Sequence, residues 1–76
     1  MNNEQKIIKL CAEIMGVEEN ELSLETSRDE LDEFDSLSIV QIIGEMEEVF
    51  QKHISEEALD HVKIEKIGDF LKLLED

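Results

Sequence analysis

Hydrophobic residues near the start of the chain recur at intervals of three and four positions. The apolar positions are Ile7, Ile8, Leu10, Cys11, Ile14 and Met15. This spacing places one apolar stripe along a helix. Asn3 can cap the helix start, and Gly16 can end it in the left-handed conformation. The pattern therefore predicts an amphipathic helix between Asn3 and Gly16.

Residues 36–50 carry the strongest helical pattern in the sequence. Apolar side chains recur every three or four residues at Leu37, Val40, Ile43, Met46 and Phe50, joined by Ile39, Ile42 and Val49. Asp35 stands at the position of an N-cap, where its carboxylate can accept a backbone N–H bond. We predict a second long helix here.

Two more helices are expected in the C-terminal third. Ser55 can cap a short helix over residues 56–59. The helical period resumes over residues 64–74, with Ile67, Phe70 and Leu71 on one side. No segment alternates like a strand.

The long connection over residues 17–34 has no regular period. Its scattered apolar residues can anchor it to the core: Val17, Leu22, Leu24 and Leu31. Ser27 and Glu30 have capping-box spacing, which predicts a short helical turn. The expected fold is all-α: a small bundle of three main helices plus one short helix, with a long loop between the first and second main helices. We expect residues 1–76 to form a single domain.

Charge restricts the possible partners. Seven Lys and Arg against 21 Asp and Glu give a net charge of −14. Such a surface repels nucleic acid phosphates and anionic membranes, and it attracts basic patches on other proteins. A hydrophobic content of 41% nevertheless argues for a folded chain.

The protein is expected to be cytoplasmic and monomeric. Cys11 is the one cysteine and falls on the apolar stripe, which favours a buried thiol over a reactive one. The first four residues lack the features of a signal peptide, and no apolar run approaches the ~20 residues of a membrane span.

The tripeptide Asp35-Ser36-Leu37 opens the central helix after the long loop. At this point the chain resembles the acyl carrier proteins, and the matching stretch is LDEFDSLSIVQIIGEMEEVF, residues 31–50. Ile67-Gly68-Asp69-Phe70 is similar to the start of the last helix in that family. The resemblance covers nearly the whole chain, and it implies that the serine of Asp-Ser-Leu receives a 4′-phosphopantetheine arm.

The physics of a helix start is consistent with this role for Ser36. A serine in the first turn points its hydroxyl into solvent near unpaired backbone N–H groups, where the helix dipole favours a phosphate. Composition alone favours an ordinary helix-start serine, because serine is common at such positions. The resemblance implies that a phosphopantetheinyl transferase modifies Ser36 with coenzyme A and that the arm then holds acyl groups as thioesters. Asp35 would fix the helix start where the transferase approaches, and Leu37 would be a small apolar contact.

The resemblance also implies partner and cargo surfaces. Candidate acids for binding acyl-transferring and acyl-processing enzymes with basic patches are Asp32, Glu33, Glu45, Glu47, Glu48, Glu56 and Glu57. Candidate lining residues of an acyl-chain pocket are Val40, Ile43, Met46, Leu59 and Val62. The alternatives are a solvated acidic face for the first set and ordinary core packing for the second.

The resemblance leaves the pathway open. Fatty-acid or related lipid biosynthesis is the first expectation. Fatty-acid carriers, however, usually have a glycine and a small residue before Asp-Ser-Leu and an acid shortly after it, whereas this chain has Glu33-Phe34 before and Ser38 after. Gln41 also stands where an acid is common. A dedicated polyketide, nonribosomal-peptide or aminoacyl pathway is the alternative, and Phe34 either packs in the core or contacts a dedicated partner.

Functions of other classes have weaker support. A hydrolase using Ser36 with His53 or His61 would need an oxyanion site, and no glycine flanks the serine as in a nucleophile elbow. An acidic interaction module without a prosthetic group explains the charge but gives Ser36 no role. His53 and His61 do not have a familiar zinc spacing, and residues 29–33 lack the pattern of an EF-hand loop, so no metal site is expected. The protein is expected not to be an enzyme.

Overall fold

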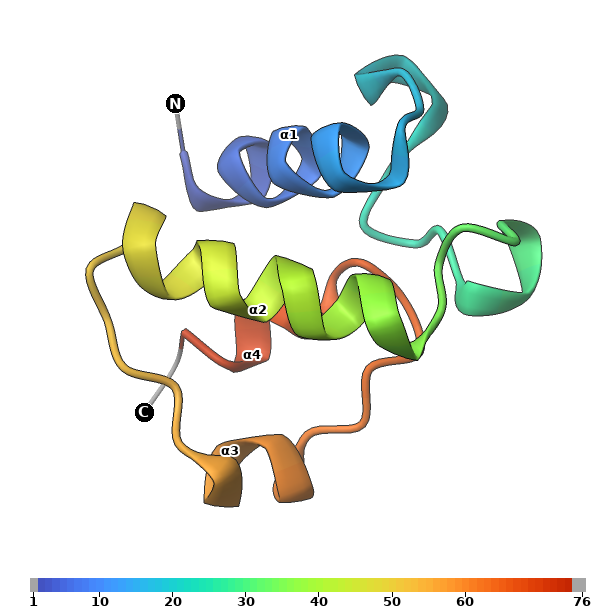
Figure 1. The fold of residues 1–76 in the computed structure, drawn as a ribbon. Helices are drawn as coiled ribbons and strands as arrows, with labels where there is room; N and C mark the ends of the chain where they lie inside the picture. Colours follow the sequence, from blue (N-terminus) through green and yellow to red (C-terminus); the bar gives the residue numbers. More distant parts are fainter. Residues whose placement is uncertain (1, 75–76) are drawn as a thin grey trace.

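The structure is a computed structural model that describes residues 2–74, apart from the Glu56 side chain. Its elements in chain order are α1 (Asn3–Met15), η1 (Glu19–Glu21), η2 (Arg28–Glu30), α2 (Ser36–Val49), α3 (Glu56–His61) and α4 (Asp69–Lys72) (Figure 1). The prediction of an all-α fold with a long first loop is confirmed, and the described residues form no strand beyond one isolated bridge.

The caps of the two long helices show why each begins and ends where it does. The N-cap of α1 is Asn2, whose Oδ1 accepts a hydrogen bond from Gln5 N at 2.8 Å. The prediction of Asn3 was wrong by one position, because two adjacent asparagines compete and Asn2 has the extended backbone that a cap requires. Gly16 ends α1 with φ at 73° and donates from its N–H to Ala12 O at 2.9 Å, as predicted.

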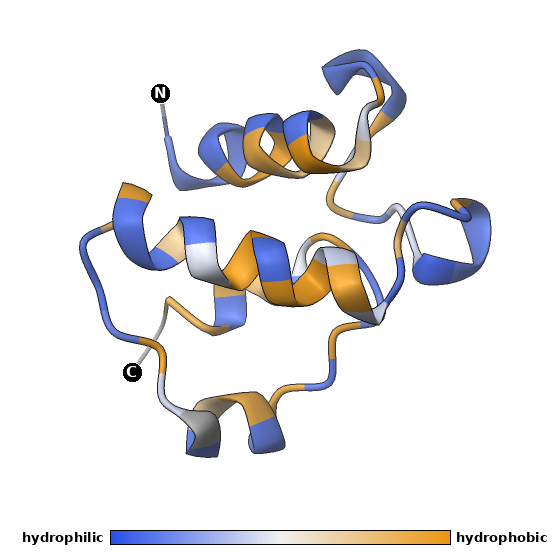
Figure 2. Cartoon of the chain, in the orientation of Figure 1, coloured by the Kyte–Doolittle hydropathy of each residue, from blue (hydrophilic) through white to orange (hydrophobic). Residues whose placement is uncertain are grey.

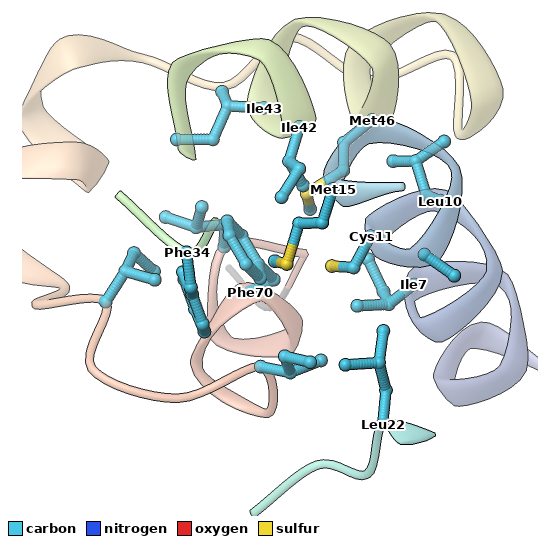
Figure 3. Packing of buried hydrophobic residues seen from close by; sticks show 14 of the residues in the cluster. Ile7, Leu10, Cys11, Met15, Leu22, Phe34, Ile42, Ile43, Met46 and Phe70 are labelled. Atoms are coloured by element: carbon cyan, nitrogen blue, oxygen red, sulfur yellow. The ribbon is translucent and has the colours of Figure 1, made fainter. Parts of the chain in front are cut away.

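The core lies between α1, α2 and α4. Figure 2 shows hydrophobic residues along the side of α1 that faces α2. The largest completely buried side chains are Phe70, Ile7, Ile42, Met46, Ile67 and Cys11, most of them labelled in Figure 3. Phe34 is only 2% exposed and stacks on Phe70 with ring centroids 6.1 Å apart. This settles Phe34 as a core residue rather than a partner contact.

The long loop is tied to the C-terminal segment by backbone hydrogen bonds. Arg28 N donates to Glu65 O at 2.8 Å, Ile67 N to Thr26 O at 3.0 Å, and Gly68 N to Leu24 O at 2.9 Å. Ser27 and Lys66 form an antiparallel bridge within this pairing. Leu22 is buried in the core, and the other three predicted anchors pack partly buried against it.

This pairing overturns part of the prediction for residues 64–74. The regular helix spans only Asp69–Lys72, and residues 64–68 are not helical. Their backbone groups bond to the long loop instead of to one another, while Asp69 Oδ2 accepts from Glu65 N at 2.9 Å and from Lys66 N at 3.1 Å. The bundle therefore has two long helices and two short ones.

The short helix α3 begins where it was predicted. Ser55 Oγ accepts from Ala58 N at 3.2 Å, which caps the helix start. Ile54 and Ile64, on either side of α3, are buried, while Ala58 and Leu59 are partly buried. In residues 2–74, no helix combines the length and apolar character needed to cross a bilayer.

Candidate functional site

Ser36 is the first residue of α2, and its side chain is exposed. Asp35 precedes it as the N-cap in extended conformation, and Asp35 Oδ1 accepts from Ser38 N at 2.9 Å. Ser38 Oγ in turn donates to Glu33 O at 2.6 Å. The two bonds join the end of the loop to the first turn of the helix, so the Ser36 hydroxyl is presented at a defined position.

The electrostatics of this helix start favour an anion beside Ser36. The N-terminus of an α-helix carries a partial positive charge from its unpaired N–H groups. The hydrogen bond from Ser38 N is the main reason that the pKa of Asp35 lies below its usual 3.8. Asp35 is therefore ionised at neutral pH and uses its charge to cap the helix.

A shallow hollow of about 350 Å³ adjoins Ser36. Its lining residues are Arg28, Ser36, Ile39, Val40, Ile43, Leu59, Val62, Lys63 and Ile64. The structure therefore brings together four of the five residues predicted to line an acyl-chain pocket. Met46 does not line this hollow, because its side chain is completely buried in the core.

Two large aliphatic side chains are exposed on α2 near Ser36. Leu37 is 68% exposed and Val40 is 66% exposed, which are high values for large aliphatic side chains. No acid occurs in α2 before Glu45. The predicted partner acids lie on either side: Asp32 and Glu33 are exposed before the helix, and Glu45 and Glu48 are exposed in its second half.

Comparison with known proteins identifies the family of the chain. The family model described as the phosphopantetheine attachment site matches residues 5–71. An acyl carrier protein from Rubrobacter xylanophilus is 37% identical over 68 residues, which are 88% of this chain and 84% of that protein. The chain belongs to the acyl carrier protein family. No solved structure matches it.

Membership establishes the prosthetic group and the class of function. Acyl carrier proteins are carriers rather than enzymes, and their covalent group is 4′-phosphopantetheine. The residues around Ser36 fit this group, because an exposed hydroxyl at the positive end of a long helix is compatible with a phosphodiester. When bound, the arm supplies a terminal thiol that holds acyl groups as thioesters.

The hydrolase alternative finds no support in this carrier. The hydrogen bond of the Ser36 side chain is with Arg28, whose Nη2 lies 3.4 Å from Ser36 Oγ. His53 lies beyond the other end of α2, where its Nδ1 is 3.2 Å from Glu47 Oε2. The serine and this histidine are therefore not paired.

Glu47 has a structural role that sequence reasoning missed. Its Oε2 accepts a hydrogen bond from Ile54 N at 2.9 Å and also contacts His53, so the carboxylate holds the turn that follows α2. Among the remaining predicted acids, Glu57 is exposed on α3, and the Glu56 side chain lies outside the described part of the structure. Sequence spacing could not reveal the contact of Glu47, because the turn between residues 50 and 54 has no regular period.

Arg28 is the other residue that sequence reasoning missed. It lies eight positions before Ser36, in η2, and reaches the serine only because the loop folds back. The one local signal was the capping box, which is present: Glu30 Oε2 accepts from Ser27 N at 2.7 Å. That box positions η2, and the backbone bond from Arg28 to Glu65 positions it against the rest of the fold.

Proposed function

We propose that Ser36 is the attachment residue of the 4′-phosphopantetheine arm and that the protein carries acyl intermediates for fatty-acid or related lipid biosynthesis. The observation that carries the proposal is the exposed Ser36 hydroxyl at the capped N-terminus of α2, within the Asp35-Ser36-Leu37 motif. The net charge of −14 supports a carrier that moves between basic partners. We place this carrier in the cytoplasm as a monomer.

Membership of the acyl carrier protein family implies the loading reaction, with Ser36 Oγ as the proposed nucleophile. Ser36 Oγ forms a bond to the phosphorus of coenzyme A that bears the pantetheine. The pyrophosphate P–O bond breaks, adenosine 3′,5′-bisphosphate leaves, and the hydroxyl proton passes to a base of the phosphopantetheinyl transferase. In this chain, Asp35 keeps the first turn of α2 in place through Ser38 N. Leu37, exposed beside the reacting oxygen, gives the transferase an apolar contact.

We assign partner binding to the exposed surface of α2 and the loop before it. Leu37 and Val40 form an apolar centre, and the exposed acids Asp32, Glu33, Glu45 and Glu48 lie on either side of it along the chain. Complementary charge raises the rate of encounter with basic patches, while exposed ion pairs add little affinity. This combination suits a carrier that must bind and leave several enzymes. Glu57 on α3 is a further candidate.

We assign the start of the acyl-chain path to the hollow next to Ser36. Val40, Ile43, Leu59 and Val62 supply its apolar lining. Covering apolar cargo there removes hydrocarbon from water, at about 25 cal/mol for each Å². The open shape of the hollow allows the cargo to return to a partner enzyme.

A dedicated polyketide, nonribosomal-peptide or aminoacyl pathway is the second candidate. The observation in its favour is the absence of acids from the first nine residues of α2, where Ser38 and Gln41 stand instead. Partners of such a surface would rely more on apolar contact with Leu37 and Val40. Phe34 does not bear on this choice, because it packs inside against Phe70.

The attachment proposal is tested by intact mass after incubation with coenzyme A and a broad-specificity phosphopantetheinyl transferase. The wild type should gain the mass of one arm, Ser36→Ala should gain none, and Ser38→Ala should still gain one. A wild type that stays unmodified, while a control carrier is loaded in the same tube, would overturn the proposal and favour an acidic interaction module. Mass spectrometry of cargo on protein purified from its own source separates the two pathway candidates.

A further inference from the structure

Arg28 is a cation in an acidic protein, and its side chain contacts a serine hydroxyl. Seven Lys and Arg face 21 Asp and Glu, so most cations could pair with a carboxylate. Lys63, Lys66 and Lys72 do so. Within residues 2–74, the guanidinium of Arg28 forms no such ion pair, and its hydrogen bond is to Ser36 Oγ at 3.4 Å. The oxygen that it contacts is the one that would bear the arm.

Contacts of the backbone around Arg28 fix its position next to Ser36. The capping box sets the turn of η2, and Arg28 N donates to Glu65 O at 2.8 Å. Lys63 enters from the segment between α3 and α4 and lines the same hollow as Arg28 and Ser36. Lys63 also lies 3.1 Å from Glu65, but both side chains are largely exposed, so this pair holds the ammonium only weakly.

Attachment of the arm creates an electrostatic problem at Ser36. The hydroxyl hydrogen is replaced by a phosphodiester that carries one negative charge. The neighbouring Asp35 carboxylate is ionised, and Asp29 and Asp32 line an adjoining hollow with Arg28 and Lys63. The new charge is therefore repelled most directly by Asp35, the adjacent residue. A guanidinium can offset this repulsion, because its planar N–H groups match phosphate oxygens.

We propose that Arg28 binds the phosphate of the arm once it is attached to Ser36, and that Lys63 supplies a second positive charge across the same hollow. This inference rests on the attachment proposed above. It assigns Arg28 a binding role in the loaded carrier, where it restrains the first atoms of the arm against η2. The rest of the arm stays free to reach partner enzymes.

The test compares loaded and unloaded forms of matched variants. Arg28→Gln removes the guanidinium, Arg28→Lys keeps the charge without the planar geometry, and Lys9→Gln removes one exposed cation elsewhere. Lys9 lines a hollow together with Val49. Val49 is at the opposite end of α2 from Ser36, about 20 Å away at about 1.5 Å per residue, so Lys9 is a control that is distant from the site. Far-UV circular dichroism of the unloaded proteins checks that each variant folds.

Two measurements report on the phosphate itself. The first is the ³¹P chemical shift of the single phosphodiester, which should differ from wild type in Arg28→Gln, differ less in Arg28→Lys and stay unchanged in Lys9→Gln. The second is the melting temperature of the loaded form minus that of the unloaded form at low salt. We expect Arg28→Gln to lower this difference by about 3–6 °C, and we expect Lys9→Gln to leave it unaltered.

Each result bears on the inference. If loading succeeds but Arg28→Gln and Lys9→Gln have equal ³¹P shifts and equal differences in melting temperature between loaded and unloaded forms, the inference is overturned. A wild type that gains no mass would overturn both the attachment proposal and this inference. The intact-mass measurement is made first, so it distinguishes this outcome from a failure of the inference alone. If Arg28→Gln loads too slowly to collect, Arg28→Lys is compared with Lys9→Gln instead; a smaller change in the ³¹P shift is then expected, and equal shifts would overturn the inference.

Discussion

Replacement of the buried Asp69 by alanine should strongly destabilise the protein. The Asp69 side chain is only 7% exposed, and its Oδ2 accepts from Glu65 N at 2.9 Å and from Lys66 N at 3.1 Å. Hydrogen bonds to a charged group contribute roughly 1.5 kcal/mol each, so losing both should cost about 3 kcal/mol. A domain of this size has only about 4–11 kcal/mol in total. The expected fall in melting temperature is about 12–24 °C.

Urea denaturation of Asp69→Ala and Lys72→Ala separates the hydrogen bonds from the ion pair. Lys72 Nζ lies 3.2 Å from Asp69 Oδ1, but the lysine is 63% exposed, so Lys72→Ala should cost less than about 1 kcal/mol. Equal losses in the two variants would refute the assignment of stability to the backbone bonds.

Acid denaturation gives a second check on Asp69. Burial by itself would raise the pKa of Asp69, but the N–H groups of Glu65 and Lys66, together with Lys72, hold it below its usual 3.8. A carboxylate with a lowered pKa in the folded state stabilises the protein above its unfolded pKa, and this contribution is lost as pH falls through the folded pKa. The stability of Asp69→Ala should therefore depend less on pH below about 3.8 than that of the wild type.

Three further outcomes are expected. Gln51 has φ at 50°, so Gln51→Gly should stabilise the protein by about 0.5 kcal/mol in urea denaturation, while Gln51→Ala should not. Burial raises the pKa of Cys11 from 9.0 to about 12, so the free energy of unfolding should fall between pH 9 and about pH 12 as the thiol of the unfolded chain ionises. Cys11→Ala should lack this part of the fall, and a pH profile identical to that of the wild type would contradict the burial argument. The net charge of −14 means that moderate salt or millimolar divalent cation should raise the melting temperature at neutral pH, and a decrease would show that the acids are not repelling one another.

Local features of the fold could be predicted from the sequence because their causes lie within a few residues. The starts of α2 and α3 follow from Asp35 and Ser55, whose side chains bond to N–H groups three positions later. The end of α1 follows from the freedom of Gly16 to adopt positive φ. The candidate attachment motif is a run of adjacent residues at a helix start, so its identity and orientation needed no tertiary information.

The extent of α4 could not be predicted in this way. Residues 64–74 have a helical period, but backbone bonds to the loop near Thr26 keep residues 64–68 out of the helix. A helix can form only where the backbone has no better partner, and the partner here lies some forty positions earlier in the chain. Two other contacts were missed although they are closer in the sequence. Arg28 Nη2 reaches Ser36 Oγ over eight positions, and Ile54 N reaches Glu47 Oε2 over seven, but both cross irregular segments whose path no helical period indicates.

The sequence by itself therefore determined the class of fold, the starts of α2 and α3 and the position of the candidate attachment serine, since periodicity and capping act over three or four residues. Only the tertiary structure decided which side chains surround that serine. Arg28, Val40 and Lys63 come from three separate segments and meet at one hollow because the core and the pairing of the long loop bring those segments together. Contacts of this kind depend on how the chain folds back on itself, and a local sequence pattern does not predict that path.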